Sequence, residues 1–371
     1  MKLRFKKHVA LTLISLMLLS LIGCGKPAST DTTTTTEAAV TEAPAASISD
    51  AATTADSTPA DASEEGSDAQ TVYPVTVTDQ AGREVTIEKE PESIVSGYYI
   101  STSLLLALGL KDKVTGIEAK ADKRPIYKLA APEFLELPNV GTAKEFDLET
   151  CASLSPELVI LPMKLKDAAQ SLSELDIPVL LVNPESEDQL EQMIELVSTA
   201  TNTKENADVL LSYIDEKKEM LEKDLSGVDA KSVYLAGNSS LLSTAGPAMY
   251  QSGLIELAGG KNAASEITDT YWAEISYEQL LAWDPSYIIL ASDAEYTPED
   301  VLNDENLKEC TAVKNGNVYA IPGDIEALDS PVPGGILASI WLAGILHPDQ
   351  VSADMYTEEK AAFYETFYGI K

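Results

Sequence analysis

The sequence predicts an α/β fold in which two Rossmann-like α/β lobes are joined by one long interlobe helix. Short apolar segments alternate with helical patterns, which is typical of parallel sheets that are buried on both faces. Residues 187–225 have a helical pattern for nearly their whole length. The pattern that precedes this region returns after it, as "DLETCASLSPELVIL" and "ISYEQLLAWDPSYIIL" show, so we expect duplicated lobes.

The N-terminus has the order of a signal peptide. Basic residues within positions 2–7 precede an apolar run, 9–22, that is short for a membrane-spanning helix. The run ends at Gly23-Cys24, and this order resembles the lipobox of bacterial lipoproteins, in which the cysteine carries lipid. We expect a lipoprotein signal peptide over residues 1–23 and lipidation at Cys24, which would anchor the protein on the extracytoplasmic face of the cell membrane. The alternative is an ordinary signal peptide or anchor with an incidental cysteine.

Residues 24–72 are predicted to comprise the lipidated cysteine and a disordered tether. Positions 25–70 are rich in Thr, Ala, Ser, Asp and Glu and contain no aromatic residue. Such a segment buries too little apolar area to offset the entropy cost of ordering it. A long spacer after a lipid suits a cell wall that has to be crossed, and this favours a Gram-positive-type envelope.

The charge and the cysteines exclude several classes of function. The net charge is −34, and cleavage after residue 23 would remove four basic residues and no acidic one. This argues against nucleic acid or an anionic membrane surface as a partner, so any anion site has to be local. Besides Cys24 there are only Cys151 and Cys310, which could pair, and no C-x-x-C indicates a redox or thiolate-zinc site.

The N-terminal lobe is expected over residues 73–186. Alternating apolar and polar residues on both sides of Gln80-Ala81-Gly82 predict a β-hairpin over 73–91. The first helix is predicted to start with Ser101 or Thr102 as its N-cap. Strands are predicted at 93–97, 113–118, 157–162 and 177–183, and helices at 101–110, 147–156 and 165–176.

The interlobe helix region is expected over 187–225 and the C-terminal lobe over 226–371. A Ser-x-x-Gln capping pattern at Ser186 predicts where the helical region starts. In the second lobe, strands are predicted at 232–237, 286–291 and 317–323, and helices at 248–260, 275–285 and 334–346.

Six segments in order resemble a known family. They are "VTDQAGREVTI", "LALGLKDKVTGI", "LPNVGTAKEFDLETCASLSPELVIL", "WAEISYEQLLAWDPSYIIL", "AVKNGNVYAIP" and "ILASIWLAGILHPD". Over about residues 73–350 the chain is similar to ABC-transporter substrate-binding proteins of the iron-siderophore, haem and corrinoid branch. The resemblance implies a largely preformed ligand cleft between the lobes, no catalysis, no cofactor, and an ABC permease with its ATPase as partners. We expect a monomer.

Two carboxylates match family positions that face the permease. The resemblance implies that Glu149 in "DLETC" and Glu278 in "SYEQL", one in each lobe, dock to permease arginines. Exposed charges at such positions orient docking and raise its rate. The alternative is an ordinary solvated carboxylate in a protein that has 60 acidic residues.

The residue inventory narrows the ligand. Besides His8 in the predicted signal peptide the chain has only His347, so an imidazole-rich transition-metal site is excluded. A chelated metal or a free oxyanion remains. The resemblance makes a ferric siderophore the first candidate, followed by a corrinoid, haem and a molybdate-type oxyanion, with the ligand a small-molecule metal complex and no metal held by the protein itself.

Ligand-facing residues are expected at the carboxyl ends of the strands, where α/β crevices open. Aromatic faces and a few cations there suit a compact, negatively charged chelate. Ser292 and Asp293 follow one such strand. The residues chosen are Tyr98, Tyr99, Ser101, Lys120, Arg124, Tyr127, Lys164, Asn238, Ser239, Tyr271, Trp272 and Ser330.

Among these residues Arg124 is the leading candidate. It lies in "KADKRPIYK", a basic cluster in an acidic chain, and besides Arg83 of the hairpin it is the only arginine of the folded region. Its planar fork can bind an oxyanion through two hydrogen bonds, whereas each neighbouring lysine is as readily a solvated loop residue. Trp272 is as readily a core residue, and of Tyr98 and Tyr99 only one is expected to face the cleft.

Two other classes of function are alternatives, an enzyme and a surface adhesin or structural lipoprotein. No Gly-rich phosphate loop, G-x-S-x-G elbow or HExxH motif supports an enzyme, although Asp/Glu pairs are too numerous to dismiss. A surface adhesin or structural lipoprotein would be consistent with the tether alone. Thermal stabilisation by one chelate would identify a binding protein, and loss of a substrate over time would identify an enzyme.

Overall fold

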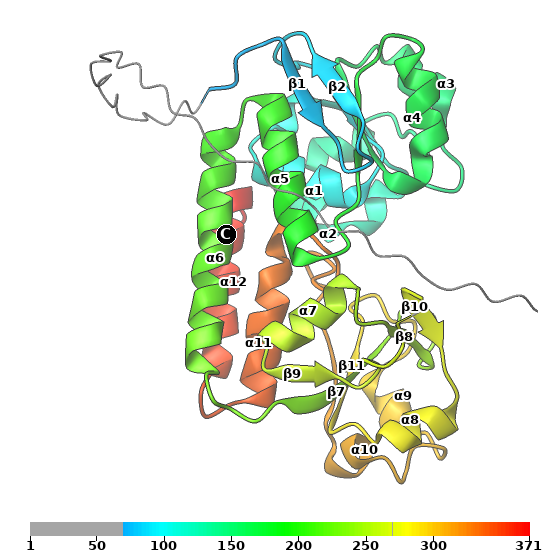
Figure 1. Cartoon of the computed structure of the whole chain (residues 1–371), viewed down its shortest axis with the longest axis vertical. Coiled ribbons are helices and arrows are strands. Elements are labelled where there is room, and N and C mark those ends of the chain that lie inside the picture. Colours follow the sequence, from blue (N-terminus) through cyan, green and yellow to red (C-terminus); the bar gives the residue numbers. More distant parts are fainter. Residues whose placement is uncertain (1–69, 269) are drawn as a thin grey trace, which may run out of the picture. The chain divides into compact units, whose positions relative to one another are not determined.

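A computed structural model describes residues 70–268 and 270–371, which contain two four-stranded parallel sheets with flanking helices (Figure 1). The α/β fold predicted from the sequence is confirmed. The expected signal peptide, Cys24 and nearly all of the tether lie outside the described residues. Within the described residues no helix combines the length and apolar character that crossing a membrane requires.

The N-terminal lobe begins with the predicted hairpin, whose strands β1 and β2 pair antiparallel. Arg83 donates from Nη2 to Asp79 Oδ2 at 2.7 Å and to the carbonyl of Val179 at 2.7 Å, so the hairpin is fastened to β6. The elements are β1 (Val75–Thr78), β2 (Glu84–Ile87), β3 (Ile94–Ser96), α1 (Tyr99–Ala107), β4 (Val114–Ile117), α2 (Pro125–Ala130), α3 (Leu148–Ser153), β5 (Leu158–Pro162), α4 (Lys166–Ser173) and β6 (Val179–Val182).

The C-terminal lobe repeats this design and adds a small antiparallel pair, β8 with β10. Two short helices, α9 and α10, were not predicted. The elements are β7 (Lys231–Ala236), β8 (Ser243–Ala245), α7 (Tyr250–Leu257), β9 (Gly260–Asn262), β10 (Trp272–Glu274), α8 (Tyr277–Trp283), β11 (Tyr287–Leu290), α9 (Pro298–Leu302), α10 (Thr311–Asn315) and β12 (Val318–Ala320).

The two main sheets have the same topology. The strand orders are β4-β3-β5-β6 and β9-β7-β11-β12, all parallel, which is the order 2-1-3-4 when each sheet is numbered along the chain. In both lobes a short helix, α3 or α8, precedes the third strand. The duplication inferred from the sequence is therefore present in the fold.

The connection between the lobes differs from the single helix that was predicted. Helix α5 (Glu187–Thr201) ends at Asn202, which has φ 58° in the left-handed region, and α6 (Lys204–Asp224) follows. The two helices pack side by side, so α6 alone is the long helix that leads to the second lobe (Figure 1). Ser186 caps α5 by accepting from the Gln189 amide, as its pattern predicted.

Two C-terminal helices complete the described chain. Helix α11 (Ile336–Leu346) is apolar on nearly all sides, and it packs against α6, α7 and α12. An all-round apolar helix is stable in water only when it is covered in this way. The sequence did not predict α12 (Ala353–Tyr368), which also contacts α1 of the first lobe.

The predicted N-cap of the first helix is wrong. Helix α1 begins at Tyr99, with Tyr98 in an extended conformation as its N-cap. Ser101 and Thr102 lie inside the helix. The Ser101 hydroxyl donates to the carbonyl oxygen of Tyr98, and the Thr102 hydroxyl lies 3.2 Å from the same oxygen but donates to Glu118 at 2.7 Å. Serine and threonine that bond back to the preceding turn in this way are compatible with a helix interior.

Candidate functional site

The site is built at the carboxyl ends of the central strands. In a 2-1-3-4 sheet the crevice opens between the first and third strands, here β3 and β5 in one lobe and β7 and β11 in the other. Tyr98 and Tyr99 follow β3, and Met163 and Lys164 follow β5. In the second lobe Asn238 lies two residues beyond β7, and Asp293 comes shortly after β11.

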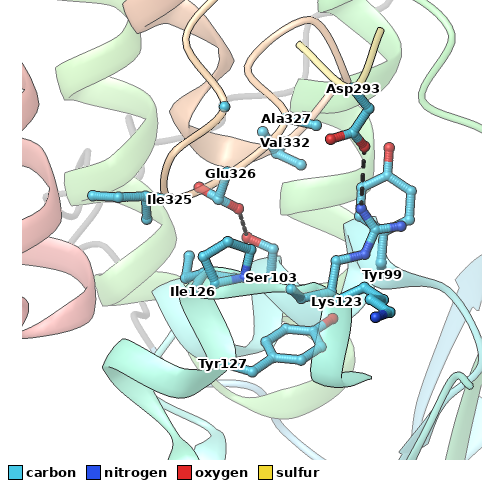
Figure 2. Close-up of a pocket in the computed structure, with 13 residues that line it drawn as sticks. Tyr99, Ser103, Lys123, Ile126, Tyr127, Asp293, Ile325, Glu326, Ala327 and Val332 are labelled. Carbon is cyan, nitrogen blue, oxygen red and sulfur yellow. Dashed lines mark hydrogen bonds and ion pairs between the residues drawn. The ribbon is translucent and has the colours of Figure 1, made fainter. Parts of the chain in front are cut away.

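Two openings lie here, each lined by both lobes. The Arg124 cavity is small, about 30 Å³. Its lining residues are Tyr99, Ser103, Lys123, Arg124, Pro125, Ile126, Tyr127, Asp293, Gly323, Ile325, Glu326, Ala327 and Val332 (Figure 2). The Trp272 cleft is wider, about 540 Å³. Its lining residues are Met163, Lys164, Lys166, Asn183, Glu185, Met249, Tyr271 and Trp272.

Arg124 is held at the first opening by its place in the chain. It is the N-cap of α2, and Pro125 at the first helical position fixes the direction in which the helix starts. Its guanidinium carbon lies 4.0 Å from the centroid of the Tyr99 ring. One of its nitrogens, Nη1, lies 3.8 Å from Oδ2 of Asp293 in the other lobe. The arginine therefore has an aromatic support on its own lobe and a counter-charge across the opening.

Tyr99 links the lobes directly. Its hydroxyl donates to Ser330 Oγ at 2.5 Å, and nearby the amide of Ile126 donates to the carbonyl of Ile325 at 3.1 Å. Burial raises the pKa of Tyr99 to about 12, although the hydrogen bond with Ser330 and the charge of Arg124 both oppose the rise. Tyr99 is accordingly a neutral hydrogen-bond donor at physiological pH.

Tyr127 helps to position helix α2, which follows Arg124. Its side chain is 1% exposed, and its hydroxyl donates to Glu118 Oε1 at 2.6 Å. The other oxygen of Glu118 accepts from Thr102 at 2.7 Å. Burial raises the pKa of Glu118, and these hydrogen bonds oppose the rise. The buried carboxylate thus ties α2, which carries Arg124, to α1.

Glu326 is a site residue that the sequence analysis missed. It is buried, and across the cavity it accepts a hydrogen bond from Ser103 of α1 (Figure 2). Tyr364 of α12 donates to its other oxygen. Burial raises its pKa to about 7, with both hydrogen bonds and the charge of Arg124 opposing the rise. No local pattern could have revealed it, because one glutamate in a loop of an acidic chain has no distinguishing signal.

The Trp272 cleft is lined by aromatic and thioether side chains, two lysines, one amide and one acid, Glu185. Tyr271 and Trp272 are 56% and 40% exposed, which is unusual for side chains of their size, and Met163 and Met249 lie beside them. A Cβ on Gly237, at the end of β7, would lie 3.0 Å from the Trp272 ring. The edge of the indole therefore lies close to the glycine, and part of the ring stays exposed to a ligand.

Several predicted residues lie elsewhere. Ser101 is fully buried and bonded to Ser96 and Tyr98, so the expectation that it faces the ligand is wrong. Tyr98 is mostly buried and lines neither opening. Lys120, Asn238 and Ser239 are exposed but also line neither. Ser330 lies at the lobe contact as the partner of Tyr99.

Glu149 and Glu278 occupy equivalent exposed positions. Each is the second residue of its helix, α3 or α8, whose N-cap is Asp147 or Ser276. Its own backbone amide and the Ser276 hydroxyl lower the pKa of Glu278. The two carboxylates therefore present negative charge from the same register of duplicated helices.

The remaining predicted features are structural. His347 is 3% exposed, and its Nε2 lies 2.9 Å from the carbonyl oxygen of Gly259. Cys151 and Cys310 are buried free thiols, so they do not pair. Among the described residues no three His, Cys, Asp or Glu side chains come together in a way that could hold a metal ion.

Comparison with known proteins gives a consistent result. Residues 94–325, more than half of the chain, match the family described as periplasmic binding protein. The ABC transporter substrate-binding lipoprotein YvrC of Bacillus subtilis is 29% identical over 70% of this chain and 82% of its own. The molybdate-binding protein MolA of Haemophilus influenzae is 24% identical, covering 79% and 90%.

Two further matches extend this comparison. The petrobactin-binding protein YclQ of Bacillus subtilis is 23% identical over 66% of this chain and 79% of its own. The crystal structure of a periplasmic solute-binding protein from Veillonella parvula is similar with a TM-score of 0.71 and 26% identity. This match covers 80% of the present chain and 93% of that one.

Proposed function

Because the chain belongs to the periplasmic binding protein family, it is a non-catalytic substrate-binding protein of an ABC importer, and we propose that its substrate is a metal chelate. A ferric siderophore is the first candidate. The protein would capture the chelate outside the membrane and deliver it to the permease and its ATPase.

The Trp272 cleft carries this proposal. Its volume of about 540 Å³ is within the range of small-molecule sites, roughly 300–1,000 Å³. Exposed Tyr271 and Trp272 offer flat faces to the organic part of a chelate, and Lys164 and Lys166 offer positive charge at the rim. Arg124, at the neighbouring opening, can bind an oxyanionic group with its planar fork.

The relatives support a chelate and also a second candidate. One relative is named as a petrobactin-binding protein, which favours a siderophore. Another is named as a molybdate-binding protein, and the Arg124 cavity, about 30 Å³, is closer in size to a bare oxyanion than to a chelate. A molybdate-type oxyanion is therefore the second candidate, while a corrinoid and haem remain ligands to be tested.

The location and the docking surface are further parts of the proposal. YvrC is named as a lipoprotein, and the sequence around Cys24 resembles a lipobox, so we propose that a lipid at Cys24 anchors the chain to the membrane. Glu149 and Glu278 lie in the same register of duplicated helices, which supports them as the charges that meet the permease. The monomeric state stays a prediction.

A tryptophan-fluorescence titration tests the ligand. Ferric siderophores, cobalamin, haem and molybdate are titrated in parallel, and we expect saturable quenching by a ferric siderophore. Trp272→Phe should lose this signal while Trp283→Phe, away from the cleft, should keep it. No response to ferric chelates, together with a micromolar or tighter response to another ligand, would overturn the chelate assignment and leave the class unchanged.

A further inference from the structure

We propose that Asp293 competes with the ligand for Arg124, so that an anionic group enters the site only by displacing the Asp293 carboxylate. The proposal rests on the proposed function, because it concerns the charge of the ligand group that binds at the Arg124 cavity. Asp293 thereby becomes a residue that sets specificity without needing to touch the bound ligand.

The contact between the two side chains is incomplete. Arg124 Nη1 and Asp293 Oδ2 are 3.8 Å apart, which is too long for a hydrogen bond. A guanidinium and a carboxylate in their best geometry make two parallel N–H···O bonds instead. The fork of Arg124 therefore still has donors to offer to an anion that is better placed than Asp293.

The two partners differ in their freedom to move. The Asp293 side chain is 58% exposed, and it follows β11 in a loop of the second lobe. The Arg124 side chain is 31% exposed and lies over the Tyr99 ring, which Ser330 holds through a hydrogen bond. An arriving anion would accordingly meet a fixed guanidinium and a carboxylate that has room to turn toward solvent.

The other carboxylates near Arg124 are already engaged. Glu118 and Glu326 both feel the charge of Arg124. Each of them accepts hydrogen bonds from buried hydroxyl groups on both of its oxygens. Asp293 differs because it is exposed and pairs with Arg124 across the opening. It is thus the carboxylate that an anion can exchange with.

The exchange discriminates between ligands by charge. A neutral ligand cannot balance the positive charge of Arg124, so Asp293 stays beside Arg124 when such a ligand binds. The ligand then gains no binding energy from Arg124. An anion that makes a bidentate contact replaces the weaker pair with a stronger one. When the ligand leaves, Asp293 pairs with Arg124 again and balances its charge. This pairing lowers the free energy that is needed to release the ligand.

The first test measures affinity at low salt, using the full chain in detergent. The probes are a trianionic ferric tris-catecholate, molybdate and uncharged cyanocobalamin. Asp293→Asn should bind whichever anionic probe the wild type binds about 3- to 10-fold more tightly, and the gain should fall as salt rises. Binding of cyanocobalamin should change by less than about twofold. Glu295→Gln is the matched control, because it removes the same charge from the same exposed loop without lining the cavity.

The second test needs no ligand. Phenylglyoxal modifies arginines, and the chain has only three, so mass spectrometry can follow Arg124 with Arg83 as the internal reference. Modification of Arg124 should be faster in Asp293→Asn than in the wild type or in Glu295→Gln. Equal modification rates, or equal affinities for an anionic probe that binds, would overturn the competition and leave the transport function intact. If no probe binds but Arg124 is modified faster in the variant, the proposed ligand class fails, while the pairing of Asp293 with Arg124 that limits access to the guanidinium stands.

Discussion

The guanidinium carbon of Arg124 lies 4.0 Å from the centroid of the Tyr99 ring, so the charge that faces the Arg124 cavity lies against an aromatic surface. Such a cation–π contact contributes about 0.5–1 kcal/mol where water still reaches it, and more where it is dry. Tyr99 is itself fixed to Ser330 of the other lobe. The orientation of the arginine therefore depends on residues of both lobes.

Replacing Arg124 should weaken anion binding beyond the loss of one charge. Arg124→Lys keeps the charge but loses the fork and the stacking on Tyr99, so we expect the affinity for an anionic chelate to fall about 10-fold or more. Isothermal titration calorimetry measures this loss. Lys128→Ala is the control, since Lys128 is exposed on the same short helix and does not line the cavity. Equal affinity in Arg124→Lys and in the wild type would remove Arg124 from the site.

Tyr127 was predicted to touch the ligand, and its burial now suggests a supporting role. Tyr127→Phe removes the hydroxyl that donates to Glu118 and leaves one buried carboxylate oxygen without that partner. We expect the free energy of unfolding in urea to fall by about 1–3 kcal/mol. A fully stable variant with much weaker ligand binding would instead show that Tyr127 contacts the ligand, as first predicted.

Glu326 should make stability depend on pH. Its pKa is about 7 in the folded protein against an ordinary value of 4.5, so the folded state holds the proton more tightly. Protonation of Glu326 therefore favours the folded state. Its contribution to the free energy of unfolding is fully present below about pH 4.5 and is lost as the pH rises through about 7, and it amounts to about 3 kcal/mol at most. Urea unfolding of the wild type and Glu326→Gln at about pH 5 and about pH 8 measures the difference. Identical pH dependence in the two proteins would contradict this result.

Substitution of Glu149 and Glu278, the proposed docking residues, should affect transport without affecting ligand binding. Glu149→Ala and Glu278→Ala alter exposed carboxylates outside both openings, so ligand affinity and thermal stability should stay unchanged. Uptake of labelled ligand by cells that express the cognate permease should fall, by about 10-fold in the double variant. Glu222→Ala, an exposed acid on α6, serves as the control. Normal uptake in the double variant would show that these charges are ordinary solvated carboxylates.

The two buried thiols should not react with thiol reagents in the native protein. Cys151 and Cys310 are free and buried, and burial raises the pKa of Cys151 to about 12. Because the thiolate is the reactive form, Ellman's reagent should label neither residue before unfolding and both after it. Peptide mapping would locate the labels. Native labelling, or a disulfide that needs reduction first, would contradict the structure.

The fold was predictable because its strands are continuous apolar segments. Strands such as Leu158–Pro162 are buried on both faces, so their sequence alone identifies them. The N-cap prediction for α1 failed because serine and threonine are favoured at caps, whereas here Ser101 bonds back to Tyr98 from within the helix and Thr102 bonds to Glu118. Helix α12 was missed because its buried face is formed by aromatic residues near the chain end, Phe363, Tyr364 and Tyr368, and not by an aliphatic stripe.

The site was only partly predictable, for a related reason. Strand ends indicated Tyr99, Arg124 and Lys164, because chain direction alone determines which edge of a parallel sheet carries them. Trp272 was predicted from its place before the 275–285 helix, and it lies at the start of the antiparallel strand β10. Contacts such as Arg124 with Asp293, or Ser103 with Glu326, depend on how two lobes far apart in the sequence meet. No local pattern contains that information.

Helix α12 changes the mechanics of the linkage between the lobes. The chain crosses between the lobes along α6. One helix alone would resist bending but would allow one lobe to rotate relative to the other about the helix axis. Helix α12 runs beside α6, joined to it where Tyr213 and Lys217 contact Glu359, and it also reaches α1. Two neighbouring helices that are joined by these side-chain contacts resist such a rotation as well. We therefore expect the lobes to make only small opening and closing movements. Such a restraint would keep the spacing of Glu149 and Glu278 nearly constant, as their proposed docking to a permease requires.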